Sequence, residues 1–196
     1  MRTTILTSLL LVLLCSSCTG QTPSKPRTVY NKEFKWTIVI PADFQNVSAA
    51  DWAKMKDKGA EAIENTYGEE IVDATTTLFV FKNADFNYLE ANAQPYDVNE
   101  DGNYLDNCKN VNEIIYETFR TQLAGASIDS LTSVTEISGL EFQTFTMKLD
   151  LPNGITMHSS MYSRLFDDQE FSVNIMYVDE AQGEKMNTAW ARSIFE

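Results

Sequence analysis

The residues best spaced for chemistry form the acidic run Asp97-Val98-Asn99-Glu100-Asp101-Gly102. Side-chain oxygens at alternate positions, followed by a glycine, match the first half of a calcium-binding loop. A bidentate glutamate should close such a loop at its twelfth position, but Cys108 stands there. The pattern therefore favours a solvated acidic turn whose charges stabilise the N-terminus of the next helix. Calcium binding by Asp97, Asn99 and Asp101 stays an alternative.

Beyond the first eighteen residues, which contain Cys15 and Cys18, the chain has one thiol, Cys108, and one imidazole, His158, so a Cys–His dyad would have to use this pair. Cys108 lies on an apolar helical stripe, where a free cysteine is usually inert and burial raises its pKa. His158 lies in a strand and, if Asn153-Gly154 is a two-residue turn, it faces Leu149. A single histidine also leaves no way to build the common two-histidine zinc motifs. We therefore predict no catalytic residue, no metal ligand and no cofactor.

Acidic and aromatic side chains are the remaining candidates. The chain has 28 Asp and Glu residues, and two of them could support glycoside hydrolysis if they converged to roughly 5–9 Å, which sequence spacing does not report. No glycine-rich loop leads from a strand into a helix, so phosphate binding is not indicated. Six tyrosines could line a binding surface, although their spacing places most of them in the core or at its rim. These are Tyr88, Tyr96, Tyr104, Tyr116, Tyr162 and Tyr177.

The first eighteen residues have the pattern of a targeting signal rather than that of a folded element. Arg2 precedes an apolar run from Ile5 to Leu14, and small residues then lead to Cys18. A secretory signal has three parts: a positively charged N-terminus, a short apolar core and small residues before the cleavage site. An apolar run of about ten residues is too short to cross a hydrocarbon core of about 30 Å.

This segment resembles a bacterial lipoprotein signal. The resemblance implies that residues 1–17 are removed and that Cys18 is the lipid attachment site, carrying acyl chains such as palmitate. Cys15 departs from the aliphatic residue that is usual three places before the lipidated cysteine. We expect a location in the bacterial cell envelope, at the outer membrane and facing the periplasm. Residues 18–27 contain two prolines and predict an extended tether with a reach of at most about 30 Å.

The charge of the chain limits its partners. The full chain has 15 basic and 28 acidic residues, and removal of residues 1–17 takes away only Arg2, which leaves a net charge of −14. Such a charge repels phosphate backbones and anionic lipid surfaces. Nucleic acid is therefore not an expected partner, and we expect the lipid on Cys18 to hold the protein at a membrane. Cys108 is then left without a partner for an intramolecular disulfide.

Hydrophobic periodicity predicts alternating blocks of strands and helices in residues 28–196, a length suited to one domain. The first strand ends at Pro41, and the first helix has Ser48 as its N-cap and Gly68 as its stop. The expected elements are a strand at 34–40, a helix from 48 to about 66, strands at 75–82 and 86–93 with a turn at 83–85, a helix at 104–123, strands at 131–137, 140–151, 155–166 and 170–178, and a helix from Asp179 onward.

This order favours an α+β fold with an antiparallel sheet over a doubly wound parallel sheet. Four features resemble the PsbP-like superfamily: the opening strand closed by Pro41, the strand at 75–82, the strand start Gly139-Leu140-Glu141-Phe142 and the terminal Ser193-Ile194-Phe195. The resemblance implies an antiparallel β-sheet flanked by helices, an α/β/α sandwich, and a role as a binding or accessory subunit. It transfers no functional residue, because no family motif matches.

The sequence therefore predicts a lipid-anchored bacterial envelope protein with three parts: a signal peptide at 1–17, a lipidated cysteine and tether at 18–27, and a single α+β domain at 28–196. The domain is expected to be a non-catalytic binding or accessory module with an envelope protein as its partner. An envelope hydrolase that uses surface carboxylates and a calcium-dependent binder are the alternatives. Two acids converging in a deep cleft would favour the hydrolase.

Overall fold

The computed structural model describes residues 25–68 and 74–196, and this part of the chain forms two antiparallel sheets and three helices. The large sheet has the strand order β3-β4-β5-β9-β8-β7-β6, and the small sheet has the order β1-β2-β10. The strands are β1 (Arg27–Asn31), β2 (Trp36–Ile40), β3 (Gln45–Asn46), β4 (Thr76–Lys82), β5 (Tyr88–Pro95), β6 (Ser127–Ile137), β7 (Leu140–Asp150), β8 (Thr156–Phe166), β9 (Gln169–Tyr177) and β10 (Ile194–Phe195). The helices are α1 (Ala49–Tyr67), α2 (Tyr104–Gln122) and α3 (Glu180–Ala191).

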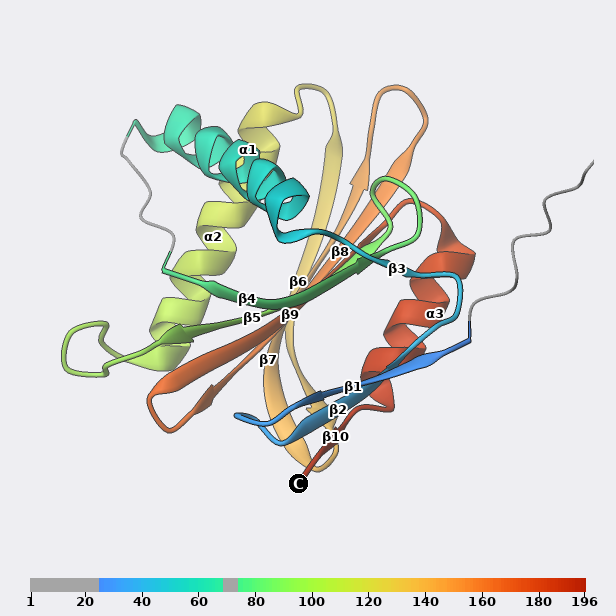
Figure 1. Ribbon diagram of the computed structural model, residues 1–196. Helices are drawn as coiled ribbons and strands as arrows, with labels where there is room; N and C mark the ends of the chain where they lie inside the picture. Colours follow the sequence, from blue (N-terminus) through green and yellow to red (C-terminus); the bar gives the residue numbers. More distant parts are fainter. Residues whose placement is uncertain (1–24, 69–73) are drawn as a thin grey trace, which may run out of the picture.

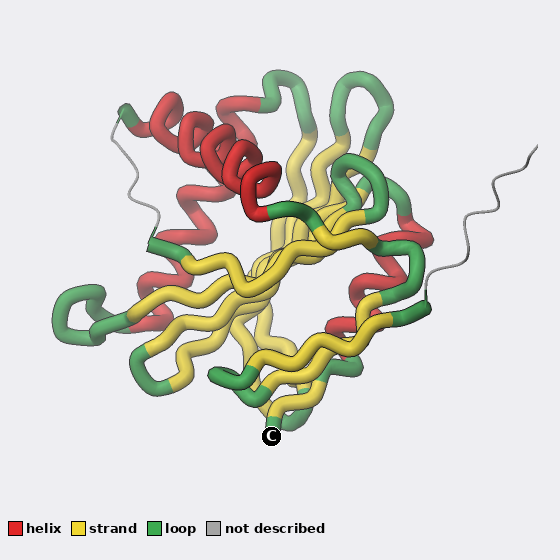
Figure 2. Tube along the Cα trace, viewed as in Figure 1, coloured by secondary structure: helices red, strands yellow, loops and turns green. Residues whose placement is uncertain are grey.

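The large sheet forms the middle layer. Helices α1 and α2 cover one of its faces, and α3 together with the small sheet covers the other (Figures 1 and 2). This arrangement confirms the predicted α+β class and the antiparallel sheet flanked by helices. None of the helices in the described part of the chain combines the length and the apolar character that a bilayer crossing requires.

The small sheet was not predicted. β1 has no clear apolar alternation, since its five side chains are exposed or only half-buried. β3 and β10 have two residues each, which is too short for a periodic signal. The predicted opening strand is β2, whose alternate residues Trp36, Ile38 and Ile40 are buried as expected.

An aromatic core lies between the large sheet and the layer formed by α3 and the small sheet. Trp36 of β2 packs edge-on against Phe171 of β9, with ring centroids 4.9 Å apart, and Trp190 of α3 packs against Phe142 of β7 at 5.2 Å. Phe195 of β10 adds a ring 5.5 Å from that of Phe142. Elements from both ends of the domain therefore share one core, and each aromatic pair adds about 0.5–1.5 kcal/mol beyond its buried area.

The helix boundaries follow the predicted caps. The Ser48 side chain accepts a hydrogen bond from the Asp51 amide, and Gly68 ends α1 with a positive φ of 74°. The predicted apolar face of α1 is only partly buried, since Trp52 is enclosed while Met55 and Tyr67 are exposed. Helix α2 packs more closely on the sheet than α1 does, and its apolar residues contact Phe145, Met147 and Leu149.

The predicted register of the β7–β8 hairpin is wrong by one residue. His158 lies opposite Lys148, and Met157 takes the place opposite Leu149. The cause is a turn longer than Asn153-Gly154: the Gly154 amide donates to the Leu151 carbonyl at 2.9 Å, and the Leu151 amide donates to the Ile155 carbonyl at 2.8 Å. Gly154 has a φ of 83°, so it adds a bulge position after the turn, and the pairing shifts by one.

Candidate functional site

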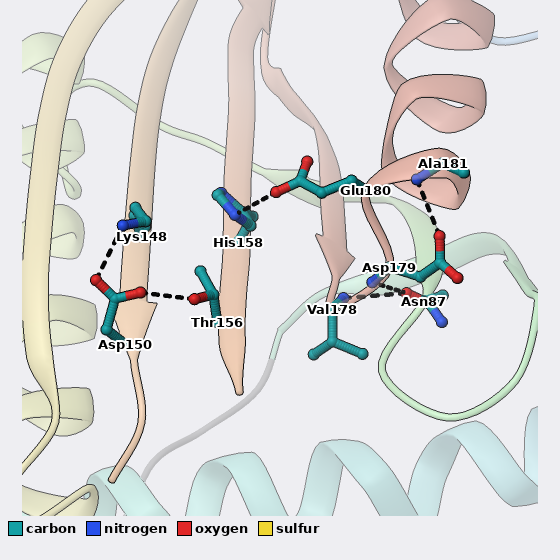
Figure 3. A network of polar contacts seen from close by, with 9 residues as sticks. All are labelled: Asn87, Lys148, Asp150, Thr156, His158, Val178, Asp179, Glu180 and Ala181. Carbon is teal, nitrogen blue, oxygen red and sulfur yellow. Dashed lines mark hydrogen bonds and ion pairs between the residues drawn. The ribbon is translucent and has the colours of Figure 1, made fainter. Parts of the chain in front are cut away.

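A row of polar side chains crosses the sheet face that carries α3. Strand register places Asp129 of β6 opposite Lys148 of β7, Lys148 opposite His158 of β8, and His158 opposite Tyr177 of β9. Directly paired residues in neighbouring strands project from the same face of a sheet. We call these four residues the polar row. Glu180, the first residue of α3, reaches over the end of the row toward His158 (Figure 3).

Two open grooves meet at Tyr177. The α3 groove has a volume of about 720 Å³ and is lined by Tyr177, Glu180, Ala181, Glu184, Asn187, Thr188 and Ala191. The sheet groove has a volume of about 330 Å³ and runs over the polar row to Ser130 and Leu131 of β6. A ligand lying along both grooves would therefore cross the sheet from α3 to its outer strand.

His158 is fixed in position from two sides. Its ring stacks on the Tyr177 ring, with centroids 4.7 Å apart and an angle of 9° between the planes. Its Nε2 atom lies 3.0 Å from Glu180 Oε1, yet the alignment does not give Nε2 a regular hydrogen bond within the described residues. Glu180 therefore lies close to the imidazole without an aligned hydrogen bond. Burial, followed by the nearby Glu180 charge, raises the pKa of the Tyr177 hydroxyl.

The start of α3 is positioned by contacts from distant parts of the chain. The buried Asn87 side chain, in the β4–β5 connection, accepts hydrogen bonds from the Val178 amide at 3.0 Å and the Asp179 amide at 3.1 Å. Asp179 then caps the helix by accepting from the Ala181 amide at 2.9 Å (Figure 3). Gly183 lets the helix approach closely, because a Cβ at this position would lie 2.5 Å from the Tyr177 ring.

Lys148 belongs to a second small network beside His158. Its ammonium group donates to Asp150 Oδ2 at 2.9 Å, and the Thr156 hydroxyl donates to Asp150 Oδ1 at 2.7 Å (Figure 3). The hydrogen bond from Thr156 lowers the pKa of the Asp150 carboxyl, and the hydrogen bond from Lys148 lowers it further. The ammonium group of Lys148 is therefore held beside the polar row by Asp150, which leaves a positioned charge next to His158.

Strand β6 forms an open edge of the large sheet. Its eleven residues pair with β7 without interruption, from Ser127 opposite Asp150 to Ile137 opposite Leu140. It contains no proline, lysine or bulge, three features that commonly block edge-to-edge pairing, and its charged residues are the two carboxylates Asp129 and Glu136. Leu131 and Val134 are 64% and 54% exposed. Within residues 25–68 and 74–196, the outer edge of this strand has no strand partner, so its backbone N–H and C=O groups, flanked by apolar side chains, are open to an added strand.

The structure keeps Cys108 and His158 apart. The Cys108 thiol is buried under α2, with Sγ 3.8 Å from Ser163 Oγ. Ser163 and His158 are five residues apart on β8, so they point to opposite faces and lie about 16 Å apart. Burial raises the pKa of the Cys108 thiol, which makes it a poor nucleophile. The prediction that this cysteine is a core residue is confirmed.

The acidic run at 97–102 folds back on itself. The Asp97 carboxylate accepts from both the backbone amide and the side-chain amide of Asn99 at 2.9 Å, and the Asp101 carboxylate accepts from the Asp97 amide at 2.8 Å. Asp97 also lines a shallow groove of about 380 Å³ with Asp167 and Asp168. Across residues 25–68 and 74–196, no three Asp, Glu, His or Cys side chains converge as metal ligands would.

Two carboxylates that water reaches poorly, the buried Glu90 and the half-buried Glu170, were not singled out by sequence. Both lie on the sheet face under α1 and α2, away from the polar row. Glu90 accepts from Trp52 Nε1 at 3.1 Å and from Asn174 Nδ2 at 3.4 Å. Glu170 accepts from Gln94 and, at 3.2 Å, from the Tyr104 hydroxyl. Burial raises the pKa of each carboxyl, but each is already bound by protein groups, and neither lines the two grooves that meet at Tyr177.

Sequence reasoning located some of the site and missed the rest. Tyr177 was among the tyrosines considered for a binding surface, whereas Lys148, Glu180 and the β6 edge were not considered. The absence of proline and lysine from 127–137 is typical of a central strand, so sequence alone carries no signal that this strand lies at an edge. Cys18, the predicted lipid attachment site, lies outside the described residues.

Comparison with known proteins supports the fold. No protein-family model matches the chain, and no curated protein matches it in sequence. The fold is similar to the solution structure of cyanobacterial PsbP (CyanoP) from Synechocystis sp. PCC 6803, with a TM-score of 0.57 and 9% identity over 93% of this chain and 99% of that one. A crystal structure from Bacteroides thetaiotaomicron VPI-5482 has a TM-score of 0.47 and 9% identity, and covers 89% of this chain and 49% of its own. The first similarity confirms the predicted PsbP-like fold, and at this identity it concerns the fold alone.

Proposed function

We propose that this chain is a lipid-anchored bacterial envelope protein whose PsbP-like domain is a non-catalytic binding module. In this proposal, the module binds an extended segment of a partner protein along β6. The observation that carries the proposal is the long, regular and unblocked β6 edge beside the sheet groove. Addition of a strand to an open sheet edge is a common mode of peptide recognition.

The charge of the surface favours a basic partner segment. Residues 42–196 contain ten basic and 27 acidic residues, a net charge of −17. Asp129 stands on β6 itself, and Glu180 and Glu184 line the α3 groove that continues the sheet groove. Complementary charges speed association and select among partners, so a cationic extended segment fits this face best.

The anchor is proposed from the N-terminal sequence. Cys18 lies nine residues before Arg27, the first residue of β1, so the acylated end could stand up to about 30 Å from the domain. More than one acyl chain gives stable membrane attachment, and a bacterial lipoprotein modification would supply them. The proposed location is the outer membrane, with the domain facing the periplasm.

Replacement of the lipidated residue tests the anchor. We expect Cys18→Ala to move the protein from the membrane fraction to the soluble envelope fraction, because the acyl chains are lost. The measurement is fractionation of intact envelopes with and without a carbonate wash. If the Cys18→Ala protein stays in membranes as firmly as the parent, anchoring at this residue is wrong.

A cross-linking experiment tests strand addition at β6. A photo-reactive amino acid at the exposed Ser133 should give one discrete cross-linked species in intact envelopes, joined to an extended basic segment of the partner. We expect the double change Leu131→Lys and Val134→Lys to abolish it, because two lysines on an edge strand oppose both strand pairing and a basic partner. The matched control is Leu105→Lys on α2, where the replaced side chain is 49% exposed. Cross-linking that survives the double change would contradict the proposal.

A further inference from the structure

The outer face of the small sheet is an exposed surface close to the proposed tether. Tyr30 of β1 and Ile194 of β10 both lie opposite Thr37 of β2, so these three side chains share one face. Val39 projects from the same face, because it follows Thr37 by two residues on β2. The alternate β2 residues, such as Trp36 and Ile38, point inward and are buried. We call Tyr30, Thr37, Val39 and Ile194 the small-sheet face.

Three of these four side chains are large, apolar and solvent-exposed. Tyr30 is 54% exposed, Val39 is 51% exposed and Ile194 is 55% exposed. Val39 also borders a groove of about 490 Å³ whose lining includes Pro26, Pro41 and Arg192. A contiguous group of exposed apolar side chains marks an interaction surface.

The chain segment that forms most of this face has a net charge of opposite sign to that of the rest of the domain. Residues 25–41 contain four basic residues and one acid, a net charge of +3, whereas residues 42–196 carry −17. Lys25, Lys32 and Lys35 are all exposed, and no ion pair engages them within the described residues. Glu33 is the one acid of this segment. Glu184 lies on the groove that Val39 borders, together with Lys185 and Arg192, and Asp167, Asp168 and Glu196 lie near Lys35. The excess of positive charge is therefore a property of the segment 25–41, which supplies β1, β2 and the turn between them.

We propose that the small-sheet face lies against the surface of the bilayer that holds the anchor, with its lysines at anionic lipid headgroups and Tyr30, Val39 and Ile194 at the interface. This inference rests on the proposed lipid anchor. Cys18 is seven residues from Lys25, a reach of about 25 Å at most, so the acyl chains keep this side of the domain nearest to the membrane. Basic side chains near an anionic leaflet and amphipathic rings at its surface both favour this orientation.

The orientation has a functional consequence. The small sheet covers one part of the large sheet, while β6 is the last strand at one edge of that sheet. Residues 25–41, with a net charge of +3, would face the lipid, and the strongly acidic residues 42–196 would be repelled from it. The lipid on Cys18 would supply the attachment, and the charge distribution would supply the orientation that leaves β6 open to a partner.

The test uses the full lipidated chain in vesicles of phosphatidylglycerol and phosphatidylethanolamine with brominated acyl chains. An environment-sensitive fluorophore is attached at Val39→Cys or, as the matched control, at Val134→Cys. Both valines are exposed strand residues, at 51% and 54%, on different sheets. Cys108 is buried, so labelling is done on the folded protein. We expect a blue shift and quenching by brominated lipid for the label at position 39, and neither change at position 134.

Charge-reversal variants separate the attraction of the lysines to lipid headgroups from the apolar contact of the face with the membrane. The triple change Lys25→Glu, Lys32→Glu and Lys35→Glu should abolish the quenching at position 39, and so should vesicles of neutral phosphatidylcholine. The control triple change is Lys54→Glu, Lys58→Glu and Lys109→Glu, on the exposed sides of α1 and α2, and it should leave the quenching unchanged. Quenching that is insensitive to the first triple change would overturn the role of the lysines.

The outcomes distinguish failure of the inference from failure of the anchor. Protein that floats with the vesicles but shows equal quenching at positions 39 and 134 overturns the docking face and leaves the anchor intact. Protein that does not float with the vesicles overturns the anchor itself.

Discussion

At the scale of single residues, Glu90 shows how the domain stabilises a carboxylate where water is excluded. Its side chain is 8% exposed, and its two oxygens are held by Trp52 and Asn174. Burial penalises the charged form more than these hydrogen bonds favour it, so the pKa of the carboxyl is raised from its ordinary value of 4.5. The folded state therefore binds this proton more tightly than the unfolded state does.

This gives a pH-dependence with a defined sign. Above the ordinary pKa the unfolded state loses the proton first, so the Glu90 contribution to the free energy of unfolding falls as pH rises through the raised folded pKa. We expect Glu90→Gln to be more stable than the parent at pH 7, with a difference that shrinks as pH falls toward 4.5. Urea unfolding at several pH values measures this difference.

The matched control for that measurement is Glu113→Gln on the exposed side of α2. It should leave the pH-dependence of the free energy of unfolding unchanged. A Glu90→Gln protein that is less stable than the parent at every pH would show that the lost carboxylate contacts outweigh the burial of the charge.

The environment of a residue could be predicted from sequence where it depends on a local pattern, and could not be predicted where it depends on the register between two strands. The burial of Cys108 followed from its place on an apolar helical stripe. The neighbour of His158 did not follow, because the proline at 152 and the bulge at Gly154 lengthen a turn that looks like a two-residue hairpin. A shift of one residue in register changes every cross-strand partner, so the polar row could not be read from sequence.

At the scale of elements, the approach of α3 to β9 depends on Gly183. A Cβ built there would lie 2.5 Å from two atoms of the Tyr177 ring, which is closer than real contacts allow. We expect Gly183→Ala to lower the free energy of unfolding by about 1–3 kcal/mol, since the strain exceeds the gain in helix propensity of about 1 kcal/mol. It should also displace Tyr177 from His158. Denaturant unfolding and the tyrosine chemical shifts report the two effects.

Gly59 in α1 is the matched control. It also lies within a helix, and no atom stands within 4 Å of the position its Cβ would take. Gly59→Ala should therefore raise the free energy of unfolding by about 1 kcal/mol through helix propensity alone. Equal effects of the two changes would show that the contact between Gly183 and Tyr177 does not limit α3.

Elements with strong local signals were predicted well. The helices at 49–67 and 104–122 and the long strands β7, β8 and β9 match their expected ranges closely, because their caps and periodicities are clear. The short strands β1, β3 and β10 carry no such signal. They exist because neighbouring strands offer them backbone partners, which is a tertiary effect.

At the scale of the whole molecule, the two ends of the domain are joined by the aromatic core. Phe195 of β10 packs against Phe142 and Trp190, and its backbone pairs with Trp36 of β2. We expect Phe195→Ala to lower the free energy of unfolding by about 1–3 kcal/mol, because the half-buried ring loses its contacts with this core. Tryptophan fluorescence during chemical denaturation measures the loss.

Ile194 is the adjacent control, since it belongs to the same short strand but is 55% exposed. Ile194→Ala should change the free energy of unfolding by no more than about 0.5 kcal/mol. A loss as large as that of Phe195→Ala would locate the stabilising effect in the pairing of β10 rather than in the aromatic core.

The pairing of β10 with β2 also bears on the order in which the domain can fold. A chain that emerges N-terminus first from the ribosome makes β1 and β2 available early and β10 much later. The small sheet and the aromatic core could not close until β10 emerged, and contacts so distant in sequence form slowly. The first strands of the domain would therefore wait, without their final partner, until nearly all of the other described strands had been made.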